Sequence, residues 1–249
     1  MPGGPGCDSS YLQSLLDILV LPGNVWLVDF PGNGSHKVEK DDCDNWLDIF
    51  IPMIKQFKNP ILVGHSFGAQ LPLLYPECED ILKGFVIMNS SPKIWHEEAL
   101  NFAKEHNLPS FQKELDEFNA NPSDETFKHA LNACMPYYFP EKTLEKGIKY
   151  LMEIPFALAP ANWWQNYVFK TSFNAKWIPQ KVPTLIIGSE LDAMCPFVLY
   201  QNDSRFDHIV KKYIEEAGHL PWFEKPEEVK SAFDDFLSRI KDDPKGPLR

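Results

Sequence analysis

Residues 64–68 read Gly-His-Ser-Phe-Gly and directly follow the apolar run Pro60-Ile61-Leu62-Val63. A G-x-S-x-G sequence at the end of a buried strand is typical of a nucleophile elbow, a strained turn that presents a serine hydroxyl above the sheet. The two glycines allow the tight turn and the close approach of the next helix, which a Cβ atom would obstruct. The pattern favours Ser66 as a nucleophile over a purely structural Gly-Ser turn.

A serine hydroxyl needs a base that accepts its proton, and the base needs a group that fixes its tautomer. After a nucleophile elbow, these partners are expected in the order serine, acid, histidine. The apolar run 181–188 leads into an acidic loop that contains Glu190 and Asp192, and a later short strand ends at Gly218-His219. The chain therefore carries the three residue types of a catalytic triad in the expected order.

These motifs extend over nearly the whole chain, and together they resemble those of the α/β-hydrolase superfamily. Residues 29–35 are similar to the D-x-P-G-x-G-x-S loop of this family, and Gly3-Gly4-Pro5-Gly6 resembles its H-G-G-P-G oxyanion loop. The run 218–229 is similar to the histidine loop and last helix of the family. The resemblance implies Ser66 as nucleophile, Asp192 as acid, His219 as base, and the backbone amides of Gly4 and Phe67 as the oxyanion hole.

Two departures from the family pattern bear on these assignments. Family members place the acid three residues after a glycine, whereas Ser189 stands there in this chain, so Glu190 is kept as the alternative acid. Pro2 stands where the family has the histidine of its oxyanion loop, and the strands that precede this loop in the family have no counterpart. We expect a fragment or a mis-assigned start; the alternatives are a partner chain that fills the gap and a degenerate family member.

The alternation of apolar strands and helices predicts an α/β fold, in which helices cover both faces of a mostly parallel sheet. The resemblance implies an α/β-hydrolase fold with a helical cap and with its N-terminal strands missing. We assign residues 1–91 and 183–249 to the core and 92–182 to the cap. Predicted strands are 25–29, 61–64, 84–88, 184–187 and 208–214, and predicted helices are 9–21, 44–57, 68–75 and 226–240. The tail 241–249 is expected to fray.

The predicted cap is rich in aromatic residues, most of which we expect to form its own core. Trp163 and Trp164 differ, because adjacent residues of a helix cannot both face one core. One of them is expected to face a substrate pocket or a subunit interface, which look alike in a sequence. The two residues, together with Trp222, are the candidate substrate contacts, and the oligomeric state stays open.

The composition of the chain excludes some classes of binding partner and some types of site. The 249 residues carry a formal net charge of −11, which argues against nucleic acid because phosphate binding needs a basic face. The five cysteines are an odd number without a C-x-x-C pair, which favours free thiols in a reducing, cytoplasmic compartment over a zinc site or disulfides. The chain has no apolar run of about 18 residues, so no membrane segment is expected.

The favoured interpretation is a serine hydrolase that cleaves a small, largely apolar ester, amide or related acyl substrate through an acyl-enzyme. This chemistry needs no metal or organic cofactor.

The first alternative is an aminopeptidase of the proline iminopeptidase type, because that branch has a similar Gly-Gly-Pro-Gly loop and uses cap carboxylates to hold the amino terminus of a short peptide. Its elbow usually reads Gly-Gly-Ser-Trp/Tyr-Gly, however. The second alternative is a non-catalytic binding protein with the hydrolase fold. The acidic cap residues that the peptidase interpretation would use are Glu97, Glu98, Glu114, Asp116 and Glu117.

Overall fold

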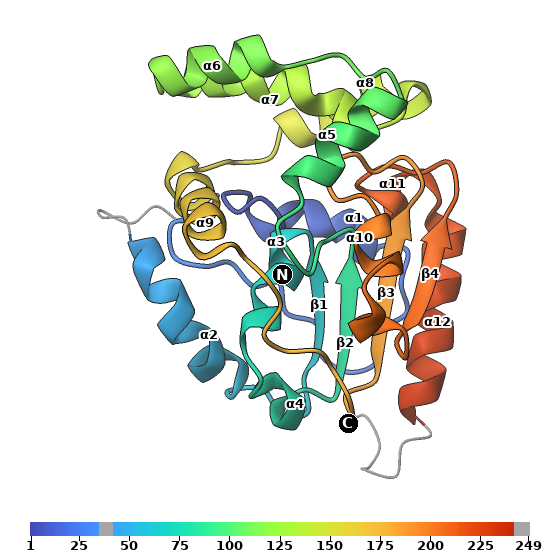
Figure 1. Cartoon of the computed structure of the whole chain (residues 1–249). Helices are drawn as coiled ribbons and strands as arrows, with labels where there is room; N and C mark the ends of the chain where they lie inside the picture. Colours follow the sequence, from blue (N-terminus) through green and yellow to red (C-terminus); the bar gives the residue numbers. More distant parts are fainter. Residues whose placement is uncertain (35–41, 242–249) are drawn as a thin grey trace.

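A computed structural model describes residues 1–34 and 42–241 of the chain. Within these residues the centre of the fold is a four-stranded sheet in the order β1-β2-β3-β4, and every neighbouring pair is parallel. Parallel strands bring their carboxyl ends to one edge of the sheet, which lies at the top of the sheet in Figure 1. The strands are β1 (Ile61–His65), β2 (Gly84–Met88), β3 (Thr184–Ser189) and β4 (Val210–Ile214).

The central strand β2 is buried along its whole length, and its side chains enter two separate hydrophobic cores. Phe85 and Ile87 belong to one core, whereas Val86 and Met88 belong to the other. Successive side chains of a strand point to opposite faces, so a strand covered on both faces needs a continuous apolar run. This explains why the parallel strands β2 and β3 were recognisable in the sequence.

Helices supply both cores, one on each face of the sheet (Figure 1). The core around Val86 is completed by η1 (Ser9–Leu12), α1 (Gln13–Leu16), α11 (Pro221–Glu224) and α12 (Pro226–Lys241). The core around Phe85 is completed by α2 (Trp46–Ile54), which follows η2 (Asp42–Asn45). Short helices also connect the strands: α3 (Phe67–Gln70), η3 (Pro72–Leu74) and α4 (Cys78–Ile81) before β2, and α10 (Val198–Gln201) and η4 (Ser204–Phe206) before β4.

The chain between β2 and β3 is helical, as expected for residues 92–182. It forms α5 (His96–Glu105), α6 (Gln112–Ala120), α7 (Asp124–Tyr138), α8 (Glu141–Met152) and α9 (Leu158–Thr171). In Figure 1, α6, α7 and α8 lie above the carboxyl ends of the strands, and α9 lies towards α2. The ring centroids of Trp163 and Trp46 are 5.4 Å apart, so α9 packs on the start of α2. The division into core and cap residues remains our prediction.

The strand predicted at residues 25–29 was wrong, because the structure has no regular element there. The side chains of Val25, Trp26 and Leu27 are 49%, 65% and 39% exposed. A strand needs a neighbour for its backbone groups, and within the described residues β1 is one of the two edge strands of the sheet and has no strand on its outer side. Met1 instead contacts the backbone of β1, because its carbonyl accepts a hydrogen bond from the His65 amide.

Several predicted boundaries also shift. The first helix ends at Leu16 rather than at residue 21, α2 is shorter than the predicted 44–57, and β4 begins at Val210 rather than at residue 208. The helix predicted at 68–75 divides into α3 and η3, because Pro72 has no backbone N–H to continue an α-helical ladder. Of the tail predicted to fray, 241–249, Lys241 is the last residue of α12, and the rest lies outside the described residues.

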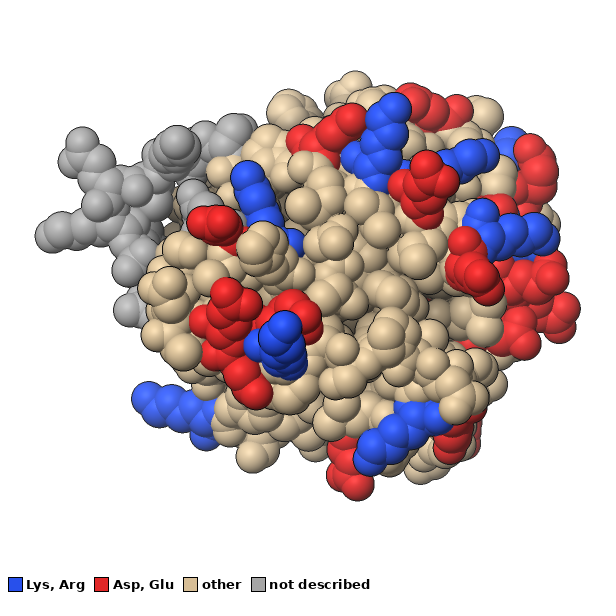
Figure 2. All heavy atoms as spheres, turned by 90° about the horizontal axis from the view of Figure 1, so that it is seen from above, with Lys and Arg blue, Asp and Glu red and all other residues tan. Residues whose placement is uncertain are grey.

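The surface carries charges of both signs. Figure 2 views the molecule from the side of α6 and α7, and uncharged side chains fill most of the centre of this face, while acidic and basic side chains are interspersed around it. Among the described helices, none combines the length and the apolar character that crossing a membrane requires.

Candidate active site

Ser66 occupies the turn between β1 and α3, as the G-x-S-x-G motif predicted. Its backbone has φ 52° and ψ −120°, a conformation that is costly for a residue with a side chain and that persists only when the surroundings hold it. The Ser66 amide donates to the Met88 carbonyl at 2.9 Å, and the Ser66 carbonyl accepts from the Ser90 hydroxyl at 2.8 Å. The strained turn is thus anchored to the end of β2.

The glycines of the motif are required by close backbone contacts. A Cβ atom on Gly64 would lie 2.4 Å from the carbonyl oxygen of Gly68. A Cβ atom on Gly68 would lie 2.4 Å from the carbonyl oxygen of Met1. Contacts this short do not occur, so both positions need glycine for the approach of α3 to β1 and of residue 1 to α3.

Asp192 and His219 lie side by side at the ends of β3 and β4. The Nδ1 atom of His219 is 2.9 Å from Oδ2 and 3.0 Å from Oδ1 of Asp192, and both side chains are buried. The structure places Glu190 elsewhere, where its Oε2 accepts from the amide of Glu216 at 2.8 Å. Of the two acids considered in the sequence, only Asp192 contacts the histidine.

The carboxylate of Asp192 is held by several hydrogen bonds. Its Oδ1 accepts from the amides of Met194 and Cys195, each at 2.9 Å. Burial alone would raise the pKa of Asp192, but the neighbouring His219 and these hydrogen bonds hold the pKa below its ordinary value. Asp192 is therefore ionised at neutral pH and can orient the imidazole ring.

Asn89 is a member of the site that the sequence analysis missed. It follows β2 with φ 43°, and its Nδ2 donates to Oδ2 of Asp192 and to Oγ of Ser189, both at 2.9 Å. The same amide group reaches the carbonyl of Gly218 at 3.2 Å, so it connects the acid loop to the histidine loop. A polar residue at the end of a buried strand, beside the elbow strand, was the signal that could have identified it.

The side chain of Ser66 also reaches the acid loop, where it lies near the thiol of Cys195. Burial raises the pKa of Cys195 well above its ordinary value, so the thiol is protonated. On the other side, a Cβ atom on Gly3 would lie 2.9 Å from Cβ of Ser66. The elbow, the acid loop and the Gly3–Gly4 loop therefore converge at Ser66.

The two predicted oxyanion donors flank this point. Gly4 has φ 105°, a conformation available to glycine, and it directly follows the Gly3 backbone that contacts Ser66. Phe67 begins α3, so its amide belongs to the first turn, where backbone N–H groups have no partner within the helix.

The structure separates the three predicted tryptophan contacts. Trp164 is 2% exposed, and its indole N–H donates to Oε1 of Gln70 at 2.9 Å. Trp222 is equally buried and packs edge-on against His65, with ring centroids 4.9 Å apart. Trp163 is only partly buried and stacks on Tyr167 at 5.9 Å. Their role as substrate contacts remains a prediction, and Trp163 has the most exposed surface of the three.

The helical segment between β2 and β3 holds the histidine loop. The amide of His219 donates to the carbonyl of Tyr138 at 2.7 Å, and the amide of Gly218 donates to the carboxylate of Glu224. Glu224 also accepts from the hydroxyl of Thr143, at the start of α8. Burial between the histidine loop and α8 raises the pKa of Glu224, because it disfavours the charged carboxylate.

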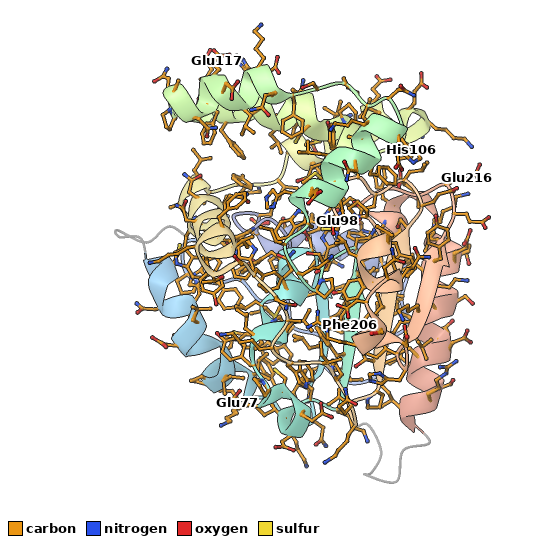
Figure 3. All side chains as sticks on the ribbon, viewed as in Figure 1. Glu77, Glu98, His106, Glu117, Phe206 and Glu216 are labelled. Carbon is orange, nitrogen blue, oxygen red and sulfur yellow. The ribbon has the colours of Figure 1, made fainter. Side chains whose placement is uncertain are left out.

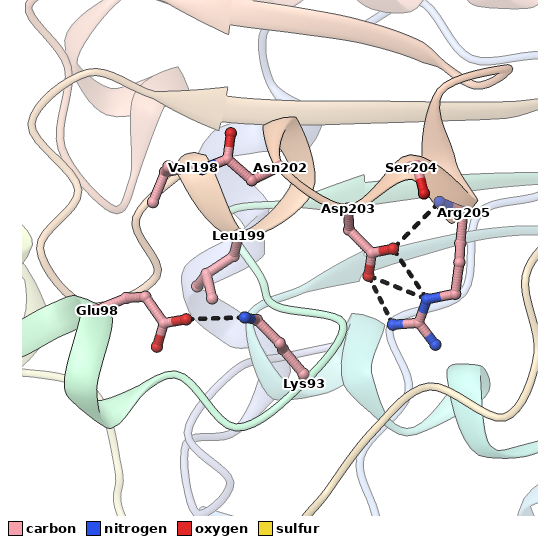
Figure 4. Close-up of a pocket in the computed structure, with 8 residues that line it drawn as sticks. All are labelled: Lys93, Glu98, Val198, Leu199, Asn202, Asp203, Ser204 and Arg205. Atoms are coloured by element: carbon pink, nitrogen blue, oxygen red, sulfur yellow. Dashed lines mark hydrogen bonds and ion pairs between the residues drawn. The ribbon is translucent and has the colours of Figure 1, made fainter.

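A cavity of about 250 Å³ lies near α5 and α10, and none of the candidate triad residues lines it (Figure 4). Its charged groups are paired, with Lys93 bound to Glu98 at 2.9 Å and Arg205 to Asp203 at 2.6 Å. The cavity therefore offers no unpaired charge to a ligand. Across the described residues, no group of three or more His, Cys, Asp or Glu side chains could hold a metal ion.

The acidic residues considered for the peptidase interpretation lie on two helices, with Glu97 and Glu98 on α5 and the other three on α6. Figure 3 shows Glu98 on α5 and Glu117 on the outer helix α6. Glu98 is paired with Lys93, and Asp116 accepts from Nε2 of Gln112 at 2.8 Å. Neither of these two contacts involves Ser66.

The chain matches known proteins over most of its length. The sequence pattern of the alpha/beta hydrolase family matches residues 1–232. A Mycoplasma genitalium protein that is named as a candidate esterase/lipase is 24% identical over 239 residues, which cover 86% of this chain and 82% of that protein. The chain therefore belongs to the α/β-hydrolase family, and the family and the name of this relative support a hydrolase.

Solved structures show the same fold. A proline iminopeptidase-related protein from Thermus thermophilus has a TM-score of 0.68 at 19% identity, with 96% of this chain and 87% of that chain covered. An α/β-fold family hydrolase from Bacillus anthracis has a TM-score of 0.67 at 15% identity, with 94% and 90% covered.

Proposed function

We propose that this protein is a serine hydrolase that cleaves a small, largely apolar ester, amide or related acyl substrate through an acyl-enzyme. The observation that carries the proposal is the buried Asp192–His219 pair, joined at 2.9 Å, together with the 2.9 Å contact between the His219 carbonyl and Nε2 of His65, the residue before the strained Ser66 turn. Family membership supports the hydrolase class, and the residues at the site support serine chemistry in particular.

In the proposed mechanism, Ser66 attacks the substrate carbonyl while its proton passes to Nε2 of His219. Asp192 fixes the tautomer of the ring through Nδ1 and stabilises the imidazolium that forms. The amides of Gly4 and Phe67 then stabilise the oxyanion, a contribution of roughly 3–4 kcal/mol for a well-placed donor.

His219 next donates its proton to the leaving group, which departs and leaves Ser66 acylated. A water molecule, deprotonated by the same histidine, then attacks the acyl-enzyme and releases the acid. No step requires a group beyond the substrate, water and these side chains.

The proposal is tested by the hydrolysis of a short-chain p-nitrophenyl ester by the wild type, Ser66→Ala and His219→Ala. We expect turnover by the wild type and loss of at least about 1,000-fold in each variant, because the triad acts as a unit. A parallel assay with proline p-nitroanilide tests the peptidase alternative. Turnover that survives in Ser66→Ala, or no binding and no turnover of any acyl substrate, would contradict the proposal.

A further inference from the structure

Three buried hydrogen bonds connect the oxyanion loop to the histidine loop through the elbow. The amide of Gly3 lies 2.6 Å from the phenol oxygen of Tyr11, and this oxygen lies 2.7 Å from Nδ1 of His65. Nε2 of His65 lies 2.9 Å from the backbone carbonyl of His219. The chain of contacts thus begins next to Gly4 and ends on the candidate base.

The Gly3 amide and the His219 carbonyl, at the two ends of this chain of contacts, determine which atoms of Tyr11 and His65 carry the hydrogens. A backbone amide only donates and a carbonyl only accepts. His65 must therefore carry its proton on Nε2, which leaves Nδ1 to accept from the hydroxyl of Tyr11. The phenol oxygen in turn accepts from Gly3, so each of these groups has a partner of the right kind.

We call this chain of hydrogen bonds, from Gly3 through Tyr11 and His65 to His219, the relay. Its two side chains, those of Tyr11 and His65, remain neutral. Burial lowers the pKa of His65 well below its ordinary value, an effect to which the nearby His219 adds, and burial raises the pKa of Tyr11 well above its own. The relay ends on the carbonyl of His219 rather than on its ring, so His65 does not exchange protons with the base. Its contribution is geometric.

Packing leaves the relay little freedom. The ring of Trp222 meets His65 edge-on at 4.9 Å and stacks on Tyr11 at 6.2 Å. A Cβ atom on Gly3 would lie 3.1 Å from Nδ1 of His65 and 3.2 Å from the Tyr11 hydroxyl. The oxyanion loop is therefore in contact with these two side chains as well as with Ser66.

We propose that Tyr11 and His65 are positioning residues that hold the Gly3–Gly4 backbone and the His219 backbone at fixed places relative to Ser66. This inference rests on the proposed function, because it assigns the relay to the alignment of the oxyanion hole and the base. The relay joins sequence segments that no local motif connects.

The kinetic test is Tyr11→Phe, which removes the acceptor of the Gly3 amide and the donor to His65 while keeping the ring. We expect kcat to fall roughly 10–100-fold, less than the roughly 100–1,000-fold loss when an oxyanion donor is removed outright. KM should stay within about twofold, and the affinity for a trifluoromethyl ketone, which forms a tetrahedral adduct, should fall by the same factor as kcat.

Tyr75→Phe is the matched control, because Tyr75 donates its hydroxyl proton to the Leu47 carbonyl away from the site. It should leave kcat and inhibitor affinity unchanged. If Tyr11→Phe lowers the melting temperature but leaves kcat and the inhibitor affinity at wild-type values, Tyr11 is merely structural and the proposal is overturned.

A second measurement needs no activity, and the His65 signals are assigned by their absence from the spectrum of His65→Asn. The ¹⁵N NMR spectrum of histidine-labelled wild-type protein should show one ring as the Nε2–H tautomer that stays neutral from about pH 8 to 5, where ordinary histidines become charged. An Nδ1–H tautomer for His65, or its titration in this range, would overturn the relay. Absence of acyl-substrate turnover in the wild type would instead contradict the proposed function and leave this spectrum as the separate test of the relay.

Discussion

The backbone amide of His219 donates to the backbone carbonyl of Tyr138 at 2.7 Å, so the last residue of α7 holds the candidate base. The adjacent acid loop has a similar contact, because the amide of Ala193 donates to the carbonyl of Tyr137 at 3.1 Å. The helical segment above the sheet therefore contacts both the acid loop and the histidine loop.

Gly218→Ala should disturb this contact. The added Cβ would lie 2.1 Å from the Tyr138 carbonyl oxygen, so either the loop or α7 must shift. We expect a loss of about 1–3 kcal/mol in the free energy of unfolding, typical of overpacking, together with a fall in kcat. Urea denaturation and ester hydrolysis measure the two effects.

Gly23→Ala is the control for Gly218→Ala, since no atom lies within 4 Å of the new Cβ and only the φ of 76° is unfavourable. It should cost some stability and leave kcat unchanged. Wild-type kcat in Gly218→Ala would show that the contact with Tyr138 does not position the base.

Glu224 offers a second test of the same connection. Glu224→Gln keeps an acceptor for the Gly218 amide and places an amide donor opposite Thr143, so stability and kcat should stay close to those of the wild type. Glu224→Ala leaves the buried Gly218 amide without its acceptor and the Thr143 hydroxyl with the Pro140 carbonyl alone, which should cost about 1–3 kcal/mol. Equal stability of the two variants in urea denaturation would contradict this role.

The ionised state of Asp192 predicts a pH dependence. Its folded-state pKa is lowered, so the stabilisation that it contributes is fully present above the unfolded-state pKa of about 3.9 and is lost as the pH falls through the folded-state value. The difference in unfolding free energy between the wild type and Asp192→Asn should therefore shrink below about pH 4. Urea titrations at several pH values measure it, and a difference that persists unchanged to pH 3 would argue against an ionised, stabilised carboxylate.

The same variant tests the catalytic role of the acid. Asparagine cannot hold the base in the required tautomer, and the equivalent change in a serine protease lowers kcat roughly 10⁴-fold. We expect a loss of this order in ester hydrolysis at pH 7.

Trp163 and Trp164 should respond differently to replacement by phenylalanine. Trp164→Phe leaves the buried Oε1 of Gln70 without its donor, which should lower the free energy of unfolding by about 1–3 kcal/mol. Trp163→Phe should change KM for acyl substrates with little effect on stability. Thermal denaturation and steady-state kinetics of both variants separate the roles, and the reverse pattern would mean that Trp164 faces the substrate.

Local motifs made the elbow and the buried strands predictable from the sequence. Gly64 and Gly68 mark a turn whose geometry depends on neighbouring residues, and the apolar runs of β2 and β3 reflect burial on both faces. The acid was assigned to Asp192 through a family spacing, and the structure brings that residue to His219.

The remaining features depend on contacts that no local pattern contains. The apolar segment 25–29 resembled a strand, but a strand also needs a neighbour, and this requirement is not visible in its own residues. Asn89 and Tyr138 reach the site through tertiary hydrogen bonds from chain segments distant from Asp192 and His219. Trp164 could not be distinguished from Trp163 because the packing of α9 on α3 decides which ring is buried.

The most direct test of the central claim is the reaction of the purified protein with a fluorophosphonate, followed by peptide mass spectrometry to locate the adduct. An activated serine should give a single adduct on Ser66, and the adduct should be absent in Ser66→Ala and His219→Ala. A folded wild-type protein that gives no adduct on Ser66, or an adduct on Ser66 that forms equally fast in His219→Ala, would contradict a Ser66–His219 catalytic pair.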